Sequence, residues 1–469
     1  MTRLEAAAIV ERPGTRGPSR ALLVAAAVIA PAVVALALAT GAWWLLPVLG
    51  GAAVLGAWSL ADVRATFVVA VLLATFVDYN TGRLASELAV VCAWLAWTAL
   101  LLYWRSAWKG WALPPAELTR GLAIWLGACA FGVIVGLLHG NSLRNMGLEL
   151  AAALWPVFAV AMIQAYGRRS AVYAGLGLVG IGLVHTVFGL TMLHVYHQRL
   201  GGIYFTTVTG IAAVGLWTAA LLAPTGRIRA LCLAGMVPLL AHLLFSFTRG
   251  YWLGFIAGMA VATALSWRSL GRFEPEVRAR RLLALPALAA VLAATVGLSV
   301  LYFGGGELLA AIGGRFGSSF STQVSGETLS NVIRLAEYDR AITSALQSPL
   351  IGNGLGYAFG MKDLLLGTNK EQWFVHNYYL LLWLKLGVVG LAAFAALLWG
   401  HVRAARRTVD RDPSWLARAW AITAIAVTGQ LLVILATNYS LADVNTAFTF
   451  AYVWGGYWAV RADAREARA

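Results

Sequence analysis

The chain has 469 residues, of which 60% are hydrophobic and 12% are charged, and its formal net charge is +15. Soluble domains are about 45–50% apolar and about 25% charged, and a soluble fold of this length cannot bury so much apolar surface. The composition therefore excludes a soluble enzyme, a nucleic-acid-binding domain and a disordered protein. It indicates a polytopic membrane protein, in which each helix needs about 20 apolar residues to cross the hydrocarbon core.

Apolar runs bounded by charges, Gly or Pro follow one another along the chain and predict an all-α bundle of about fourteen transmembrane helices. The first run follows a basic segment, residues 1–20, that lacks a cleavable signal, so we expect this helix to be retained. The third run is short and could be re-entrant. The predicted runs are 21–40, 43–61, 65–78, 86–104, 120–138, 146–165, 171–192, 203–223, 229–246, 250–266, 282–303, 376–399, 416–436 and 445–461.

The charge distribution predicts the orientation of the bundle. With the N-terminus in the cytoplasm and each run crossing once, 25 of the 35 Lys and Arg residues fall in inside segments, as the positive-inside rule requires. The long polar loop then lies outside, in the periplasm. The predicted organisation is a cytoplasmic N-terminus (1–20), transmembrane helices 1–11 (21–303), the external loop (304–375), transmembrane helices 12–14 (376–461) and a cytoplasmic tail (462–469).

Two arginines in short external loops are candidate anion-binding residues. Arg199 lies in "HVYHQRLGGIYF" and Arg249 in the tight turn of "LLFSFTRGYWLGF". Guanidinium groups match phosphate oxygens and stay charged at any working pH. On neighbouring helical hairpins, the two could clamp a diphosphate head group. The alternative for each is an arginine that snorkels to lipid phosphates.

His376 begins the twelfth run, in "WFVHNYYLLLWLKLGVVGLAAF", where the long loop re-enters the membrane. A neutral His at this edge can take a proton from a sugar hydroxyl. Asn377 and Tyr378 could hydrogen-bond a glycan. The alternative, which the residues by themselves favour, is an interfacial His among the aromatic side chains that gather at membrane surfaces.

The long loop contains "LSNVIRLAEYDRAITSALQSPLIGNGLGYAFG". Apolar residues recur there at helical spacing, which predicts an amphipathic helix near the membrane surface that begins at Ser330 or Asn331. Arg334 projects from its polar side. The following G-x-G-x-G run, residues 352–356, predicts a turn that brings backbone close to a ligand or a helix end.

Metal-binding and redox signals are weak. The Asp410-Arg411-Asp412 triplet has a spacing that many sugar-nucleotide transferases use for a divalent ion, but it lies in a short inside loop, and we interpret it as a turn. The three Cys residues fall in apolar runs without metal spacing. We expect no metal and no cofactor. Lys385, inside a run, is a candidate buried partner of Glu87 or Glu149.

Four segments in the same order resemble the O-antigen ligase and polymerase superfamily: "RLGGIYF", "FSFTRGYWLG", "RLAEYDRAITSALQSPLIGNGLG" and "HNYYLLLWLKLGVVGL". The resemblance covers about two-fifths of the chain, residues 199–391. It implies a membrane-embedded glycosyltransferase of the GT-C type in the bacterial inner membrane. The chain departs from the ligase pattern in two ways. It has about fourteen predicted spans where twelve are typical, and it has Tyr204-Phe205-Thr206 where the family often has small polar residues.

The resemblance implies transfer of a glycan from undecaprenyl diphosphate to a sugar hydroxyl of lipid A-core, with inversion and without a metal, at the periplasmic face. Arg199 and Arg249 would hold the diphosphate, Arg334 would be a further contact, and His376 would activate or orient the acceptor. Asn377, Tyr378 and Tyr204 are the candidate glycan contacts.

Three alternatives remain open. A polymerase that extends O-antigen, capsule or exopolysaccharide needs the same donor and takes a growing glycan as acceptor. A flippase or transporter of lipid-linked glycans is disfavoured, because the candidate cations lie at the outer edge and no internal repeat is evident. A peptidoglycan-type polymerase would want an external Asp, for which Asp443 is the nearest candidate.

Overall fold

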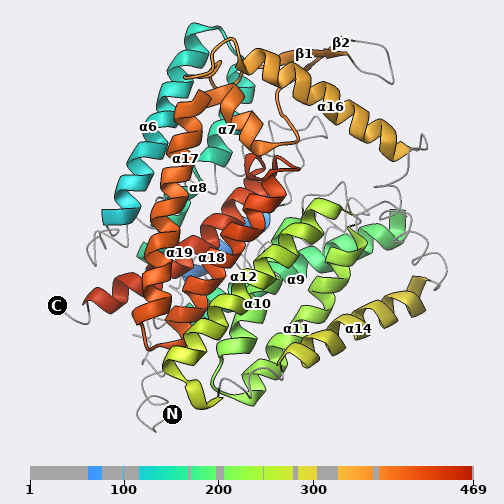
Figure 1. Ribbon diagram of the computed structural model, residues 1–469, viewed down its shortest axis with the longest axis vertical. Coiled ribbons are helices and arrows are strands. Elements are labelled where there is room, and N and C mark those ends of the chain that lie inside the picture. Colours follow the sequence, from blue (N-terminus) through green and yellow to red (C-terminus); the bar gives the residue numbers. More distant parts are fainter. Residues whose placement is uncertain are drawn as a thin grey trace, which may run out of the picture.

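The computed structural model describes residues 62–75, 99, 116–166, 171–196, 205–246, 248–277, 284–303, 326–362 and 369–466. This part of the chain is helical apart from one short antiparallel hairpin (Figure 1). The elements are α4 (Val63–Thr75), α6 (Ala116–Leu138), α7 (Leu143–Ala153), α8 (Trp155–Ala165), α9 (Ala171–Tyr196), α10 (Phe205–Leu222), α11 (Gly226–Phe245), α12 (Arg249–Phe273), α14 (Ala284–Phe303), α16 (Gly326–Ala345), β1 (Phe359–Lys362), β2 (Asn369–Gln372), α17 (Tyr378–Arg411), α18 (Trp415–Leu435), η3 (Ser440–Ala442) and α19 (Val444–Glu466).

The chain is an all-α membrane protein. Within the described ranges, five helices have the length and hydropathy to cross a membrane: α6, α11, α12, α17 and α18. The pair α7–α8 is bent by 42° and counts as a sixth span if it crosses once. Helices also occupy the other predicted runs between 65 and 461, except the run at 86–104. That run and the first two, 21–40 and 43–61, lie outside the described residues apart from position 99.

Local sequence explains where several helices begin and break. Asn377 caps α17 by accepting from Leu380 N (3.0 Å), and Thr225 caps α11 by accepting from Ile228 N (3.3 Å), as short polar residues do at helix starts. The predicted run at 146–165 breaks at Leu154, directly before Trp155-Pro156, because proline is tolerated in the first turn of a helix but not inside it.

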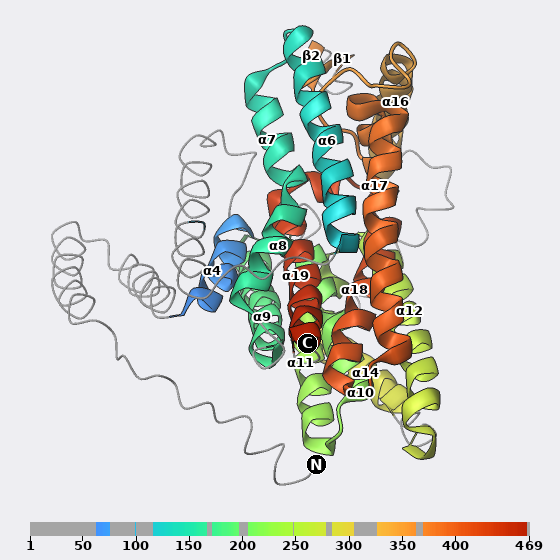
Figure 2. The same cartoon turned by 90° about the vertical axis from the view of Figure 1, so that its left-hand side faces the viewer.

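The core surrounds α19, whose residues 444–460 are all buried. Helices α8 and α4 pack on one side of it and α18 packs on another, while α12 lies along α18 (Figures 1 and 2). A helix that is apolar on every face belongs in the centre of a bundle. Aromatic side chains fill the centre, with Trp155 against Phe450 at 4.7 Å between ring centroids and His401 against Trp454 at 4.6 Å.

Charged side chains gather at one end of the bundle. Here α6 and α18 begin, and α12 and α17 end. Each of the arginines involved was assigned to the cytoplasmic side from the sequence. The ion pairs are Arg418–Glu274 (2.8 Å), Arg407–Glu117 (3.1 Å), Arg268–Asp410 (3.2 Å) and Arg461–Glu117 (3.4 Å). The described part of the long loop, α16 with β1 and β2, lies at the opposite end (Figure 2).

The long loop contains the predicted helix, but α16 begins at Gly326 and not at Ser330 or Asn331. The residues before Ser330 include Glu and Leu, which favour helix, so the helix starts one turn earlier. The hairpin after it was not predicted. Its strands pair Phe359 with Gln372 and Lys362 with Asn369, and each has only four residues, too few to leave a strand pattern in the sequence.

The glycine run after α16 enters a break in α17. Gly352, Gly354 and Gly356 all have positive φ, as does Gly387 within α17. The break frees carbonyls of α17, and the loop donates to them: Asn353 N to Leu384 O and Gly354 N to Lys385 O, both 2.9 Å. A Cβ on Gly354 would overlap the backbone of α6 at Gly136. The predicted close approach of this backbone to a helix is confirmed, and glycine is what permits it.

Candidate functional site

The candidate site lies where α17 begins, directly after the β1–β2 hairpin returns the chain to the bundle. Asn377 closes the first turn of α17, and its side-chain amide donates to Ala436 O (3.1 Å) at the end of α18. His376 is therefore held between the long loop and the segment 436–443. Its side chain is 30% exposed, so part of it is accessible to solvent.

Glu337 of α16 holds His376 at two points. One carboxylate oxygen accepts from the backbone N–H of His376 (2.5 Å), and the other lies 2.8 Å from Nδ1 of the same residue. The Glu337 side chain is fully buried. Its neighbour Tyr338 donates to the His376 carbonyl at 2.9 Å. Glu337 thus contacts a residue 39 positions away along the chain.

This contact selects the tautomer of the imidazole. A buried carboxylate accepts hydrogen bonds, so Nδ1 of a neutral His376 carries the proton and Nε2 has a free lone pair. The same carboxylate stabilises the ring when Nε2 takes up a proton, as in Ser-His-Asp triads. In this tautomer, Nε2 is the nitrogen of His376 that can accept a hydrogen bond or a proton.

Aromatic rings fix the orientation of the imidazole. Phe374 and Tyr439 pack against each other at 4.7 Å between centroids with their rings tilted by 31°, and each meets the His376 ring edge-on at 5.4 Å. An interfacial belt residue does not need such a cage together with a buried carboxylate. The arrangement therefore favours a chemical role over the belt interpretation.

Tyr378 does not share this surface. It is 4% exposed, and its ring packs on Phe394 at 5.7 Å inside the bundle. The expectation that it touches a glycan is wrong, because α17 turns the side chain that follows Asn377 inward. Asn377 remains half-buried at the surface.

Arg249 is the first residue of α12, and its helix begins against the same segment that touches His376. A Cβ on Gly250 would overlap the Thr437 hydroxyl, and Asn438 donates to the Tyr251 hydroxyl at 3.0 Å. Residues 437–439 thus contact both the start of α12 and the His376 ring. The structure brings Arg249 and His376, which are far apart in sequence, to one end of α18.

Arg334 lies one turn before Tyr338 on α16 and is half-buried. Burial raises the pKa of the Tyr338 phenol, while the charge of Arg334 acts on it in the opposite direction. Arg334 is therefore near the group that holds the His376 backbone. Arg199 and Tyr204 lie outside the described residues.

A buried ion pair lies within the bundle, two turns along α17 from the candidate site. Lys385 of α17 lies 2.5 Å from Glu149 of α7, and both are nearly inaccessible to solvent. Glu149 also accepts from Gly356 N (2.7 Å), and Lys385 donates to the Tyr357 carbonyl. The predicted pairing with Glu149 is confirmed, while Glu87 lies outside the described residues. The pair ties the glycine loop to α7 and α17.

Other candidates from the sequence have structural roles. Asp410 lies in the last turn of α17 and not in a turn between helices, and it pairs with Arg268 (3.2 Å). Asp412, directly after the helix, accepts from Ser414 N (2.8 Å). Asp443 is buried, at 6% exposure, where α19 begins. Within the described ranges, no group of three or more His, Cys, Asp or Glu residues is placed to hold a metal ion. His242 is also buried, and within the described ranges its ring nitrogens have no hydrogen-bond partner.

A comparison with protein families matches residues 234–395 to the family described as O-antigen ligase. The match covers about a third of the chain, which over these residues is similar to the O-antigen ligase family. The matched domain contains Arg249, Arg334, Glu337 and His376, so the site just described lies inside it, whereas Arg199 lies outside. No curated protein matches the chain.

The O-antigen ligase match supports the general type of activity. Members of this superfamily are ligases or polymerases of O-antigen glycans, and the family implies a lipid-linked glycan as substrate. The resemblance is confirmed for three of the four segments, which lie inside the matched residues, whereas "RLGGIYF" lies before them.

Proposed function

We propose that the protein is a glycosyltransferase that moves a glycan from undecaprenyl diphosphate to a sugar hydroxyl of lipid A-core. The reaction takes place at the periplasmic face of the inner membrane, where the long loop and the start of α17 lie. The contact between Glu337 and His376 carries the proposal, since it prepares an exposed imidazole nitrogen to take a proton.

The acceptor hydroxyl gives its proton to Nε2 of His376 as its oxygen bonds to the anomeric carbon of the donor sugar. The bond from that carbon to the diphosphate breaks, and the diphosphate leaves with the electron pair. Attack opposite the leaving group inverts the anomeric centre. Glu337 stabilises the imidazolium that forms.

Arg249 is proposed to hold the leaving diphosphate. Negative charge on the diphosphate increases as the bond breaks, and a fixed guanidinium there stabilises the transition state more than the ground state. The start of α12 adds to this effect, because helix N-termini favour anions. The Thr248 hydroxyl donates to Ser246 O (3.0 Å) and so does not cap that helix. Arg199 and Arg334 are proposed as further contacts to the diphosphate, and Asn377 as a contact to the glycan. No metal or cofactor takes part in the proposed reaction.

A polymerase is the second candidate, favoured by the same observation, since His376 and Arg249 would serve any sugar acceptor. The acceptor would then be a growing glycan on its own lipid carrier. Both reactions use one donor site, so product size distinguishes them.

The test uses purified protein in lipid bilayers with a short undecaprenyl-diphosphate glycan and lipid A-core, and follows product size on a gel. One shifted lipid A-core band would support the ligase. A ladder that forms without lipid A-core would support the polymerase. If the donor stays intact with the wild-type protein, the proposed function is wrong. Arg249→Ala and His376→Ala proteins, matched to wild type for membrane insertion, should give no product.

A further inference from the structure

Helix α12 has two faces of different composition. One face has a small residue at every fourth position, Gly250, Gly254, Gly258, Ala262 and Ser266, and all are buried. Added Cβ atoms on the three glycines would meet α18 or the residue Thr437 beyond it. Such stripes let helix backbones approach closely in membranes. This face is fixed to α18, so the opposite face of α12 points away from the bundle centre.

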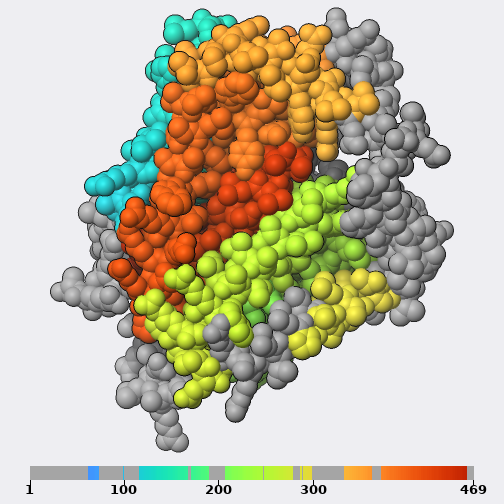
Figure 3. Space-filling view, viewed as in Figure 1, coloured from blue at the N-terminus to red at the C-terminus, as the bar shows by residue number. Residues whose placement is uncertain are grey.

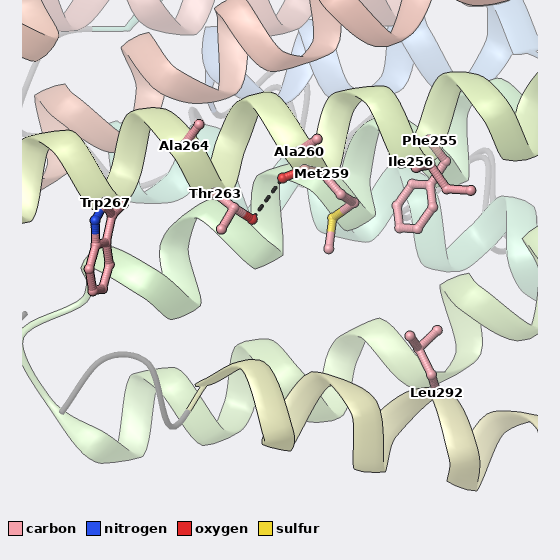
Figure 4. A pocket seen from close by; sticks show the side chains of 8 residues that line it. All are labelled: Phe255, Ile256, Met259, Ala260, Thr263, Ala264, Trp267 and Leu292. Atoms are coloured by element: carbon pink, nitrogen blue, oxygen red, sulfur yellow. Dashed lines mark hydrogen bonds between the residues drawn. The ribbon is translucent and has the colours of Figure 1, made fainter. Parts of the chain in front are cut away.

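The opposite face begins with Arg249. At 100° per residue, Ile256, Ala260, Ala264 and Trp267 lie on the same side of the helix as this arginine. These residues face α14 across a cavity of about 610 Å³ (Figure 4). Both helices lie on the face of the molecule shown in Figure 3. The cavity is lined by Phe255, Ile256, Met259, Ala260, Thr263, Ala264, Trp267 and Leu292.

The lining of the cavity offers an apolar surface to a ligand. Its one hydroxyl, on Thr263, donates to Met259 O (2.8 Å) and accepts from Trp217 Nε1 (2.9 Å), so its hydrogen bonds are made within the protein. Met259 adds a flexible side chain that adapts to an irregular partner. Ile256 is 62% exposed and Leu292 is 41% exposed, so the cavity is accessible from the side, where an apolar chain in the bilayer can enter.

Resting on the proposed function, we propose that this cavity binds the polyprenyl chain of the lipid-linked donor while Arg249 binds its diphosphate. One helix thus carries the cation and, on the same face, the apolar cavity, which together match an anionic head group with a long hydrocarbon tail.

The length of the cavity favours a polyprenyl chain over a phospholipid. At a rise of about 1.5 Å per residue, the lining extends from about 10 Å to about 27 Å beyond Arg249 along α12. One acyl chain of a phospholipid reaches about half of the hydrocarbon core, which is about 15 Å. A chain that is anchored at Arg249 and fills the cavity is therefore longer than a phospholipid tail.

The test places a photoreactive benzoylphenylalanine at Ile256 or, as the matched control, at Ile134. Ile134 is also an exposed isoleucine, 54% accessible, but it lies on α6, away from the cavity. Each protein, in bilayers of phosphatidylethanolamine and phosphatidylglycerol, is irradiated with radiolabelled undecaprenyl diphosphate. We expect at least tenfold more labelling at position 256 than at 134. Unlabelled undecaprenyl diphosphate should remove this labelling, and additional phosphatidylglycerol should not.

Equal labelling at both positions, or competition by phosphatidylglycerol, would overturn the proposal. A second variant, Ala260→Trp, fills the cavity. It should raise KM at least tenfold for an undecaprenyl-linked glycan while leaving KM for a geranyl-linked glycan unchanged, and an equal effect on both donors would also contradict the proposal. If the protein is labelled selectively at position 256 but transfers no glycan, polyprenyl binding in the cavity is supported and the proposed function is refuted. If it transfers glycan without selective labelling, the proposed function is supported and polyprenyl binding in the cavity is refuted.

Discussion

Glu337→Gln should slow glycan transfer without unfolding the protein. Glutamine keeps the size of the side chain and an oxygen that accepts from the His376 backbone N–H, so α16 keeps its position. It removes the negative charge that lies 2.8 Å from Nδ1. Hydrogen bonds to charged groups contribute about 1.5–3 kcal/mol, and about 1.4 kcal/mol corresponds to tenfold in rate. We therefore expect kcat/KM to fall by about 10- to 150-fold.

The assay is transfer kinetics with the short-glycan donor in bilayers, measured for Glu337→Gln, His376→Ala and the double variant. If Glu337 acts through His376, its substitution has no further effect once the imidazole is gone, and the double variant matches His376→Ala. Asp339→Asn is the control, because it removes the same charge from an exposed position of α16. A Glu337→Gln protein with wild-type kcat/KM, or an additive double variant, would refute the reasoning.

Three further predictions concern the glycine loop, the buried ion pair and the arginine. Gly354→Ala should prevent stable folding, because its Cβ overlaps the α6 backbone, whereas Gly360→Ala, with open space around it, should match wild type in thermal unfolding in detergent. Lys385→Met should lower the free energy of unfolding by about 3–5 kcal/mol by leaving a buried carboxylate unpaired, and adding Glu149→Gln should restore part of the loss in the same measurement. Arg249→Lys should lower kcat/KM at least tenfold in the transfer assay, because a point charge loses the bidentate geometry; wild-type activity would indicate simple snorkelling.

Hydropathy was enough to place the helices within the described ranges. Runs such as 171–192 and 416–436 differ from α9 and α18 by at most a few residues, since only a helix satisfies its own backbone in lipid. The break in α17 was not predictable. Gly387 adopts positive φ because the loop after α16 supplies Val388 N and Val389 N with acceptors, Pro349 O and Leu350 O. Those bonds form only once the fold is complete.

The candidate site likewise contains residues that the sequence identified and residues whose place only the packing of helices decides. His376 was identifiable from its position where the loop re-enters the membrane, and Arg249 from its place in a turn with few other cations. Glu337 was missed, because its spacing suggests partners on its own helix at i±3, whereas its partner is fixed by how α16 docks on α17. Tyr378 was misjudged for a related reason: which side of a helix start faces the bundle is decided by packing and not by residue type.

The convergence of the site follows from how three helices pack. α12 and α17 both begin, and α18 ends, at the same end of the bundle, and residues 436–439 of the turn after α18 contact both helix starts. Two helix N-termini at one place favour anions, and Arg249 adds a full charge there. Because α12 is fixed to α18 by its small residues and α17 is tied to the turn by Asn377, the proposed anion site at Arg249 and the proposed base His376 cannot separate without breaking helix packing. A chain that must align a leaving diphosphate with an attacking hydroxyl gains from such rigidity, since a misplacement of about 1 Å can cost about 100-fold in rate.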